Sequence, residues 1–159
     1  MLWNWPQTCA EIAYRGDLEA LKYFHEKCHE ERGTFWDQQT CAEAALAGNK
    51  TIIEWARKKG CPWNSRTMAK AAIRGHVKLM RWLRQQGCPW DSRTCEEAAL
   101  AKNLDLLKWA RKNGCEWDWR TCEAAVFQYG EETKGEKKKR VELLAWLNEQ
   151  QCPCKRQYH

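Results

Sequence analysis

The residues most able to carry chemistry in this chain are ten cysteines and four histidines. Cysteine thiolates and histidine imidazoles are the usual ligands of zinc in proteins. Two short clusters combine both residue types, but neither has the paired C-x-x-C motifs typical of structural zinc sites. They are His25 with Cys28 and His29, and Cys152 with Cys154 and His159. The sequence therefore predicts neither a metal site nor a cofactor.

Most of the cysteines recur at two positions of an internal repeat. Cys9, Cys41, Cys95 and Cys122 share the first position, and Cys61, Cys88, Cys115 and Cys152 share the second. Met68 takes the first position in one copy, and a methionine cannot replace a thiolate at a structural zinc site. Packed helices also lie about 10 Å apart, which is too far for neighbouring units to share one metal. We expect free thiols that pack as small apolar side chains, and hence a reducing intracellular compartment.

Catalytic motifs are missing from the sequence. It has no glycine-rich phosphate loop, no H-E-x-x-H and no G-x-S-x-G. The four histidines are scattered along the chain, and the carboxylates follow the periodicity of helix faces. We predict that the protein is not an enzyme.

The elements that position these residues come from a repeat of 27 residues. The stretch 88–114 matches 61–87 before it and the residues from 115 after it. A fixed period in this range is typical of a stacked array. The sequence predicts a single repeat domain over 1–159. Its units lie at about 4–34, 35–60, 61–87, 88–114 and 115–154, with an insertion at 131–140 and a frayed tail at 155–159.

Each unit predicts two short helices. The natural N-caps of the first helices are Asp37, Asn64, Asp91 and Asp118. Glycines such as Gly48 and Gly60 provide the left-handed stops. Helices of two to three turns are marginal alone in water, so the units must gain their stability by stacking. The predicted fold is an all-α solenoid of about five stacked helix-turn-helix repeats.

Tryptophans recur at two repeat positions. One series is Trp36, Trp63, Trp90 and Trp117, and the other is Trp55, Trp82, Trp109 and Trp146. Aromatic rings interleaved with basic residues can stack on nucleic-acid bases. These rings stand at core-type positions, however, and a buried tryptophan covers a large apolar area. We expect them to pack neighbouring units together.

The third unit carries the residues by which the chain resembles the ankyrin repeat family. They are Ala71, Ala72, Gly75, His76, Leu79, Met80, Leu83 and Gly87. Ankyrin repeats have about 33 residues, and the shorter unit lacks those that would form the β-hairpin finger between Trp90 and Thr94. The resemblance covers the chain from about Thr8 to Cys152. It implies a non-enzymatic protein–protein interaction module, such as a scaffold or adaptor, that binds through its first helices.

An arginine recurs just before the threonine of several first helices, and in a stack these arginines would form a ladder along one edge. The ladder is either a binding edge or a set of solvated arginines that cap local carbonyls. The positions beside it vary between units, whereas the scaffold positions do not. Residues near the ends of first helices join the candidate set because ankyrin-like proteins bind through that face. The candidate partner-binding residues are Gln38, Gln39, Ser65, Arg66, Arg74, Ser92, Arg93, Trp119, Arg120 and Phe127.

The insertion EETKGEKKKR is polar, charged and contains a glycine, so we predict a mobile surface loop. Its basic run is Lys137, Lys138, Lys139 and Arg140. These residues are candidates for contact with phosphate groups, and a plain solvated loop is the alternative.

The net charge of +6 favours partners with acidic surfaces. The first hypothesis is a protein-binding module, such as a small subunit or adaptor of a larger assembly, that binds through the first-helix face. The alternative is a basic repeat protein associated with RNA or a ribonucleoprotein. No run of about 18 apolar residues is present, so we expect no membrane span.

Overall fold

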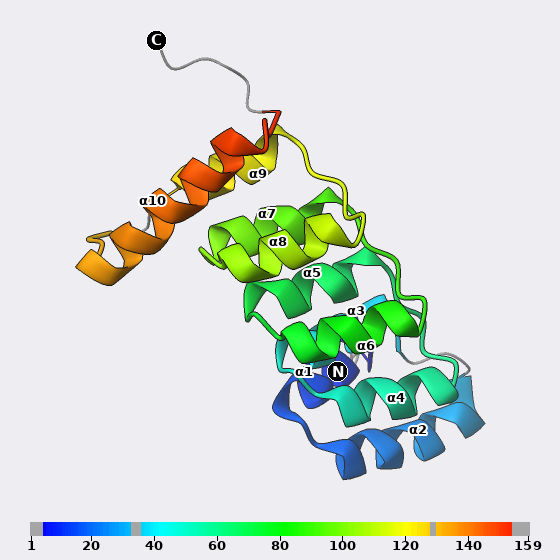
Figure 1. The fold of residues 1–159 in the computed structure, drawn as a ribbon. Helices are drawn as coiled ribbons and strands as arrows, with labels where there is room; N and C mark the ends of the chain where they lie inside the picture. Colours follow the sequence, from blue (N-terminus) through cyan, green and yellow to red (C-terminus); the bar gives the residue numbers. More distant parts are fainter. Residues whose placement is uncertain (1–4, 33–35, 128–129, 154–159) are drawn as a thin grey trace. The chain divides into compact units, whose positions relative to one another are not determined.

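The computed structural model describes residues 5–32, 36–127 and 130–153, with only the backbone described at 5–7 and 28–32. These residues form ten α-helices and no strand (Figure 1). The predicted all-α class is therefore confirmed. The predicted frayed tail at 155–159 lies outside the described residues.

The ten helices form five consecutive pairs. The first helices are α1 (Trp5–Arg15), α3 (Gln38–Leu46), α5 (Ser65–Ile73), α7 (Ser92–Leu100) and α9 (Trp119–Val126). The second helices are α2 (Leu18–Arg32), α4 (Lys50–Lys58), α6 (Val77–Gln85), α8 (Leu104–Lys112) and α10 (Lys134–Glu149). None of these helices is long and apolar enough to cross a membrane.

The first helices begin at the predicted N-caps. The side chain of Asp37 accepts a hydrogen bond from the backbone N–H of Gln39, and Asn64, Asp91 and Asp118 do the same two residues on. Each bond satisfies one of the backbone donors that a helix start leaves without an intrahelical partner. This local rule explains why four first helices start at the same register.

Gly48 shows why a glycine closes a first helix. Its φ of +77° is left-handed, a conformation that other residues adopt only at a cost. A Cβ on Gly48 would also lie 2.9 Å from the ring of His76 in the next helix pair. That ring lies 3.1 Å from the carbonyl oxygen of Leu46, measured from Nε2. Gly48 therefore ends α3 and leaves room for the next pair to stack.

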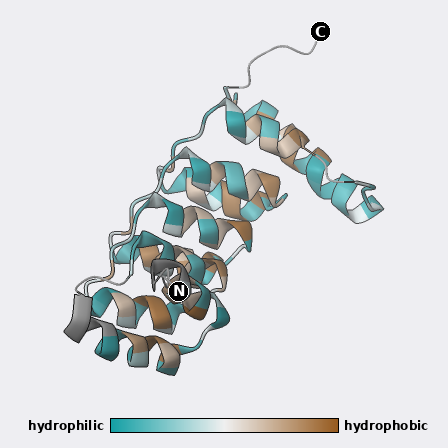
Figure 2. Ribbon diagram, turned by 180° about the vertical axis from the view of Figure 1, so that it is seen from behind, coloured by the Kyte–Doolittle hydropathy of each residue, from teal (hydrophilic) through white to brown (hydrophobic). Residues whose placement is uncertain are grey.

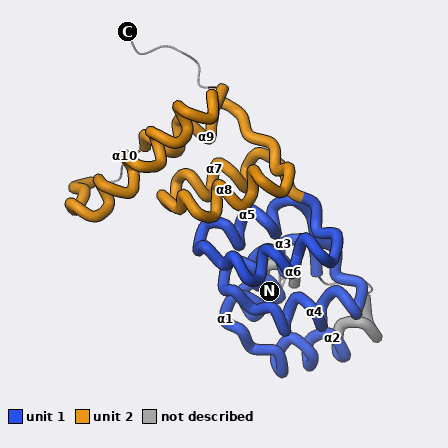
Figure 3. The backbone as a smooth tube through the Cα atoms, viewed as in Figure 1, with its two compact units in different colours: residues 1–89 blue, residues 90–159 orange. Residues whose placement is uncertain are grey.

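The helices gather into two compact units, residues 1–89 and 90–159 (Figure 3). In unit 1, α1 packs on α3 and α3 packs on α5. In unit 2, α7 packs on α9. Second helices pack against their own first helices, and each helix presents both apolar and polar residues (Figure 2). Each unit is thus a stack of helix pairs, as the repeat period predicts.

Small side chains line the contacts between first helices, and larger ones fill the space toward second helices. Ala44, Ala45, Ala71 and Ala72 are fully buried, which lets the helices approach closely. The large buried side chains are Leu21, Ile52, Ile53, Met68, Met80, Leu83, Leu106, Leu107 and Leu143. The core therefore runs between the two helices of each pair.

The two tryptophan series meet as pairs inside a repeat. Trp36 lies 5.7 Å from Trp55 in an edge-to-face arrangement, and Trp90 lies 5.8 Å from Trp109. Trp117 and Trp146 pair in the same way at 5.7 Å. We expected these rings mainly to pack neighbouring repeats together. The structure shows that they also pack against each other within a repeat.

Contact between successive repeats comes from cations placed over these rings. The Arg57 guanidinium lies 4.3 Å from the Trp63 ring, and Arg111 lies 4.2 Å from Trp117. Each arginine also donates to the carbonyl oxygen of the cysteine that follows its helix, Cys61 or Cys115. Each arginine thus joins the end of one repeat to the tryptophan of the next.

The insertion at 131–140 is not the mobile loop that its composition suggests. Residues 134–140 form the first turns of the 16-residue helix α10. Thr133 and Glu136 make a reciprocal capping box: the Thr133 N–H donates to Glu136 at 2.9 Å, and the Glu136 N–H donates to Thr133 at 3.3 Å. This cap and the helix-forming lysines, glutamates and arginine that follow outweigh the single glycine, Gly135.

Candidate functional site

The arginines of the predicted ladder are exposed, but two of them fold back on the N-caps of their own helices. Arg93 Nη2 lies 2.8 Å from Asp91 Oδ2, and Arg120 Nη1 lies 3.2 Å from Asp118 Oδ2. These guanidinium groups therefore cap carboxylates rather than the local carbonyls that the sequence interpretation considered. The charges of Arg93 and Arg120 are largely matched before any partner arrives.

The variable positions beside the ladder have a role that the sequence did not reveal. Asn64 donates a side-chain hydrogen bond to Gln38 Oε1, and Ser92 Oγ donates to Asp118 Oδ2 at 3.0 Å. In both cases the residue after one N-cap is bonded to the N-cap of the next first helix. Gln38 and Ser92 thus join consecutive repeats, which reduces the case for them as partner-binding residues.

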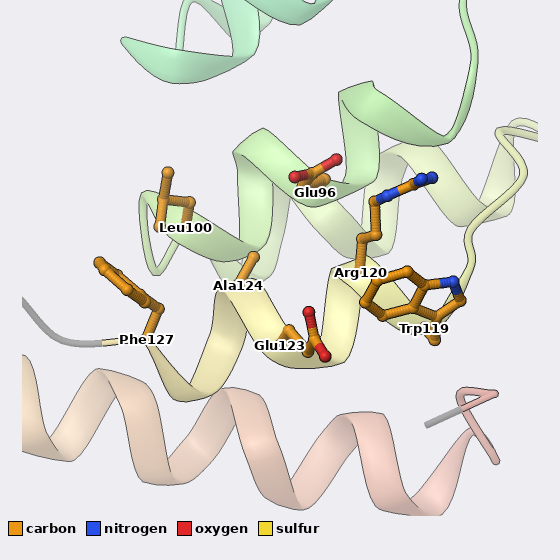
Figure 4. Close-up of a pocket in the computed structure, with 7 residues that line it drawn as sticks. All are labelled: Glu96, Leu100, Trp119, Arg120, Glu123, Ala124 and Phe127. Carbon is orange, nitrogen blue, oxygen red and sulfur yellow. The ribbon is translucent and has the colours of Figure 1, made fainter. Parts of the chain in front are cut away.

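Trp119 stands at this same register, but within the described residues no further first helix follows α9. Its side chain is half-buried and lines a hollow between α7 and α9 (Figure 4). We call this the α7–α9 hollow. It has a volume of about 370 Å³ and is lined by Glu96, Leu100, Trp119, Arg120, Glu123, Ala124 and Phe127.

The α7–α9 hollow has two aromatic ends and an apolar centre. Leu100 and Phe127 lie together at one end, Trp119 and Arg120 lie at the other, and Ala124 is between them (Figure 4). Phe127 is 49% exposed, so its ring offers apolar surface at this end of the hollow. The Arg120 guanidinium lies 5.0 Å from the centre of the Trp119 ring.

Two carboxylates border the hollow. Glu96 on α7 is half-buried and Glu123 on α9 is exposed. In the part of the chain that the structure describes, neither of them forms a salt bridge with a lysine or arginine. The hollow therefore combines apolar and aromatic contact area with two carboxylates that make no salt bridge.

Lys102 supports the hollow by capping the end of α9. Its ammonium donates to the carbonyl oxygens of Ala124 at 3.0 Å, Ala125 at 2.9 Å and Phe127 at 2.6 Å. Helix α9 ends without a glycine, and this cation satisfies the carbonyls that the end of a helix leaves free. Burial lowers the pKa of Lys102 from its ordinary value, with a further contribution from the nearby positive charge of Arg140.

Lys102 holds this place in a left-handed conformation, with φ of +53°. The second and third repeats have a glycine at this position, Gly48 and Gly75. A left-handed backbone costs a lysine about 1–2 kcal/mol, and its three hydrogen bonds to α9 offset that cost. Lysine at this position is thus explained by the end of α9, which it holds in place.

Of the predicted basic residues on the insertion, only Arg140 is engaged in a close, half-buried ion pair. Its Nη2 lies 2.9 Å from Glu132 Oε2, and its Nε donates to the same carboxylate. The hydrogen bond from Arg140 holds the pKa of Glu132 below its ordinary value. Lys137, Lys138 and Lys139 are exposed, and Lys138 lies 4.0 Å from Glu142 on the next turn.

The structure brings three of the predicted partner-binding residues together: Trp119, Arg120 and Phe127. Ser92 and Arg93 are on α7 but do not line the hollow, and Gln38, Gln39, Ser65, Arg66 and Arg74 belong to unit 1. The residues missed were Glu96, Leu100, Glu123 and Ala124. A comparison of successive repeats would have singled out Ala124, because the two preceding repeats have the long side chains of Lys70 and Glu97 at this position.

The two repeated cysteine positions meet inside a helix pair. Cys41 Sγ lies 3.6 Å from Cys61 Sγ, and in a later repeat Cys115 raises the pKa of Cys95. Reasoning from each position separately missed this pairing. In the third repeat Met68 stands at the position of Cys41, so Cys88 has no partner cysteine there. Burial raises the pKa of Cys88 to about 12.

Seven of the described cysteines are free, namely Cys9, Cys41, Cys61, Cys88, Cys95, Cys115 and Cys152. Cys122 departs from the expectation of free thiols because it forms a disulfide. His25, a member of one candidate zinc cluster, instead packs its ring 5.1 Å from Trp36. The side chains of Cys28 and His29, and all of Cys154 and His159, lie outside the described residues. Among the rest, no group of three or more potential ligands is placed to hold a metal ion.

Comparison with known proteins gives no family to which this arrangement can be referred. No family model matches the chain, and no curated protein matches it.

Proposed function

We propose that the protein is a non-enzymatic interaction module of ankyrin-like helical repeats, which binds a short segment of another protein in the α7–α9 hollow. The observation that carries this proposal is the exposed Phe127, set beside Leu100 and across the hollow from Trp119. Aromatic and apolar side chains in a concave site are typical anchors for protein partners. A subunit or adaptor of a larger assembly is a special case of this function.

The composition of the hollow supports a binding role. Four of its seven lining residues are apolar or aromatic, namely Leu100, Trp119, Ala124 and Phe127, and such surfaces are typical of binding sites. Its rigid support comes from two stacked helices and the Lys102 cap. A preformed site of this kind lowers the entropic cost of binding. The seven free thiols support a reducing compartment, whereas the disulfide at Cys122 stands against it.

The test uses a random heptapeptide library displayed on phage and selected on the intact, immobilised chain. Peptides that bind are synthesised with a fluorescent label, and their dissociation constants are measured by anisotropy. We expect Phe127→Ala to weaken binding by about tenfold or more, as loss of an aromatic anchor does. Tyr23→Ala is the matched control, because Tyr23 is an aromatic side chain of unit 1 that is 58% exposed.

Two results would overturn the proposal. One is a selection that yields no peptide whose binding depends on Phe127. The other is an equal loss of affinity in the Tyr23→Ala protein, which would show that the peptides bind exposed aromatic rings without regard to the hollow.

Association with RNA is the second candidate function, and the exposed Lys137, Lys138 and Lys139 on α10 favour it. Against it, Arg93, Arg120 and Arg140 are already paired with carboxylates. Binding through the lysines would weaken steeply as salt is raised, because each phosphate contact releases counterions. The measurement is retention of a labelled single-stranded RNA at about 50 mM salt, compared between the intact chain and a triple Lys→Gln variant.

A further inference from the structure

The charges around the α7–α9 hollow differ in sign from those of the whole chain. The chain carries a net charge of +6, which alone favours an acidic partner. The lining of the hollow has two carboxylates, Glu96 and Glu123, and a single cation, Arg120. A partner that docks there meets negative charge, so the overall charge is a poor guide to this site.

The cations nearest the hollow are already committed to other groups. Arg120 is paired with Asp118, and Arg93 lies 2.8 Å from Asp91 although Glu96 is close to it in the helix. Lys102 directs its ammonium to three carbonyl oxygens at the end of α9. None of these three cations makes a salt bridge to Glu96 or Glu123. The two carboxylates are therefore left for a charge that arrives with a ligand.

The aromatic ends of the hollow suit a cation with an apolar stem. The Trp119 ring already has a guanidinium 5.0 Å from its centre, that of Arg120, a distance typical of cation–π contact. Phe127, Leu100 and Ala124 offer apolar surface on which the methylene groups of a lysine or arginine can lie. Glu96 and Glu123 stand on opposite helices beside this surface (Figure 4).

We propose that the α7–α9 hollow recognises a basic side chain, arginine or lysine, that is flanked by apolar residues in the partner segment. The stem lies on Ala124 between Phe127 and Trp119, and the charged head is held by Glu96 and Glu123. This inference rests on the proposed function and specifies its ligand. It replaces the expectation from net charge that the partner presents an acidic surface.

The same displayed-peptide selection tests the inference through the composition of the peptides recovered. We expect an arginine or lysine beside a large apolar residue in the peptides whose binding depends on Phe127. In a labelled peptide of that set, replacing the basic residue with norleucine, which keeps the stem, should weaken binding by about tenfold, the effect of about 1.4 kcal/mol. Replacing it with glutamate should weaken binding further.

A pair of nearly isosteric substitutions that removes two negative charges assigns the effect to the two carboxylates. The double variant Glu96→Gln and Glu123→Gln should bind the basic and norleucine peptides equally well. The control variant, Glu26→Gln and Glu149→Gln, changes two exposed glutamates elsewhere and shifts the net charge by the same amount. It should keep the preference of the intact chain for the basic peptide.

The outcomes separate this inference from the proposed function. Peptides whose binding depends on Phe127 but that lack a basic residue, or carry an acidic one, would overturn this inference. The proposed function as a protein-binding module would still stand. A selection with no peptide dependent on Phe127 would overturn both. Analytical ultracentrifugation could instead show a dimer that is lost in Phe127→Ala. That result would mean that a second copy of the chain occupies the hollow, and it would also overturn the inference.

Discussion

The first-helix pair α3–α5 in unit 1 and the pair α7–α9 in unit 2 share one register but differ in a bridging contact. On α3–α5, Lys70 Nζ lies 3.1 Å from Glu43 Oε1, and both side chains are largely buried. On α7–α9, the corresponding positions hold Glu97 and Ala124. The long lysine side chain that crosses the first pair is missing from the second, where Ala124 lines the hollow. The other lining positions differ as well: α3–α5 has Ala42, Ser65, Ala69 and Ile73 where the hollow has Glu96, Trp119, Glu123 and Phe127.

The packing of the tryptophans gives the largest contrast between the two units. Trp36 in unit 1 is only 7% exposed and contacts both Trp55 and His25, whereas Trp90 in unit 2 is half-buried. We expect Trp36→Ala to lower the free energy of unfolding by about 3–5 kcal/mol, and Trp90→Ala to lower it by less. Urea denaturation followed by circular dichroism measures both. Equal losses would show that the exposure of the ring does not set its contribution.

Oxidation of the paired thiols comes next in expected effect. A thiol oxidant such as diamide would take one hydrogen from each of Cys41 and Cys61 and join the two sulfur atoms, which lie 3.6 Å apart. The bond would close a loop of about 20 residues and raise stability by roughly 2–3 kcal/mol, less any strain. Because both cysteines are fully buried, we expect slow oxidation limited by local opening.

Cys88 supplies the internal control for this experiment, since Met68 stands where its partner thiol would be. Alkylation of the unfolded, oxidised protein followed by mass spectrometry should find Cys88 modified, and Cys41 and Cys61 protected. A Cys88 that is oxidised as readily as Cys41 would mean that proximity in the folded state does not direct the reaction.

The elements of the fold that the sequence predicted well depend on contacts within a few residues. Asp37 caps the helix that begins one residue later, and Gly48 ends the same helix, so both could be recognised from the repeat alone. The cap of α10 was equally local, because Thr133 and Glu136 form the T-x-x-E pattern of a capping box. We did not recognise this capping box because we interpreted the lysine-rich insertion from its composition alone.

The candidate site was less predictable because it depends on contacts between distant segments. Phe127 and Trp119 stood out as variable positions, but whether they meet depends on how α9 packs on α7. The role of Lys102 could not be found from its neighbours, since its acceptors are carbonyl groups more than 20 residues away. The pairing of Cys41 with Cys61 likewise needs two helices to be placed together.

The Lys102 cap distinguishes the end of α9 from first helices closed by glycine, such as α3. Lys102→Met keeps the stem and the left-handed backbone but removes three hydrogen bonds, so we expect a loss of about 1–2 kcal/mol. Lys102→Gly also removes the backbone strain and should cost less than Lys102→Met. Thermal unfolding of the two variants measures the difference. Stability unchanged in Lys102→Met would show that the ammonium does not hold the end of α9.

Two substitutions test the bridging lysine alone, one in each helix pair. Lys70→Ala leaves the largely buried Glu43 carboxylate without its salt bridge, and we expect it to cost about 1–2 kcal/mol, more than the loss of an exposed ion pair. Ala124→Lys would place a long cation in the α7–α9 hollow within reach of Glu97, with little change in stability. It should weaken peptide binding by about tenfold or more, whereas Lys70→Ala should leave that binding unchanged. Anisotropy titrations and urea denaturation measure the two effects, and a hollow that binds equally well after Ala124→Lys would show that the missing lysine does not create the site.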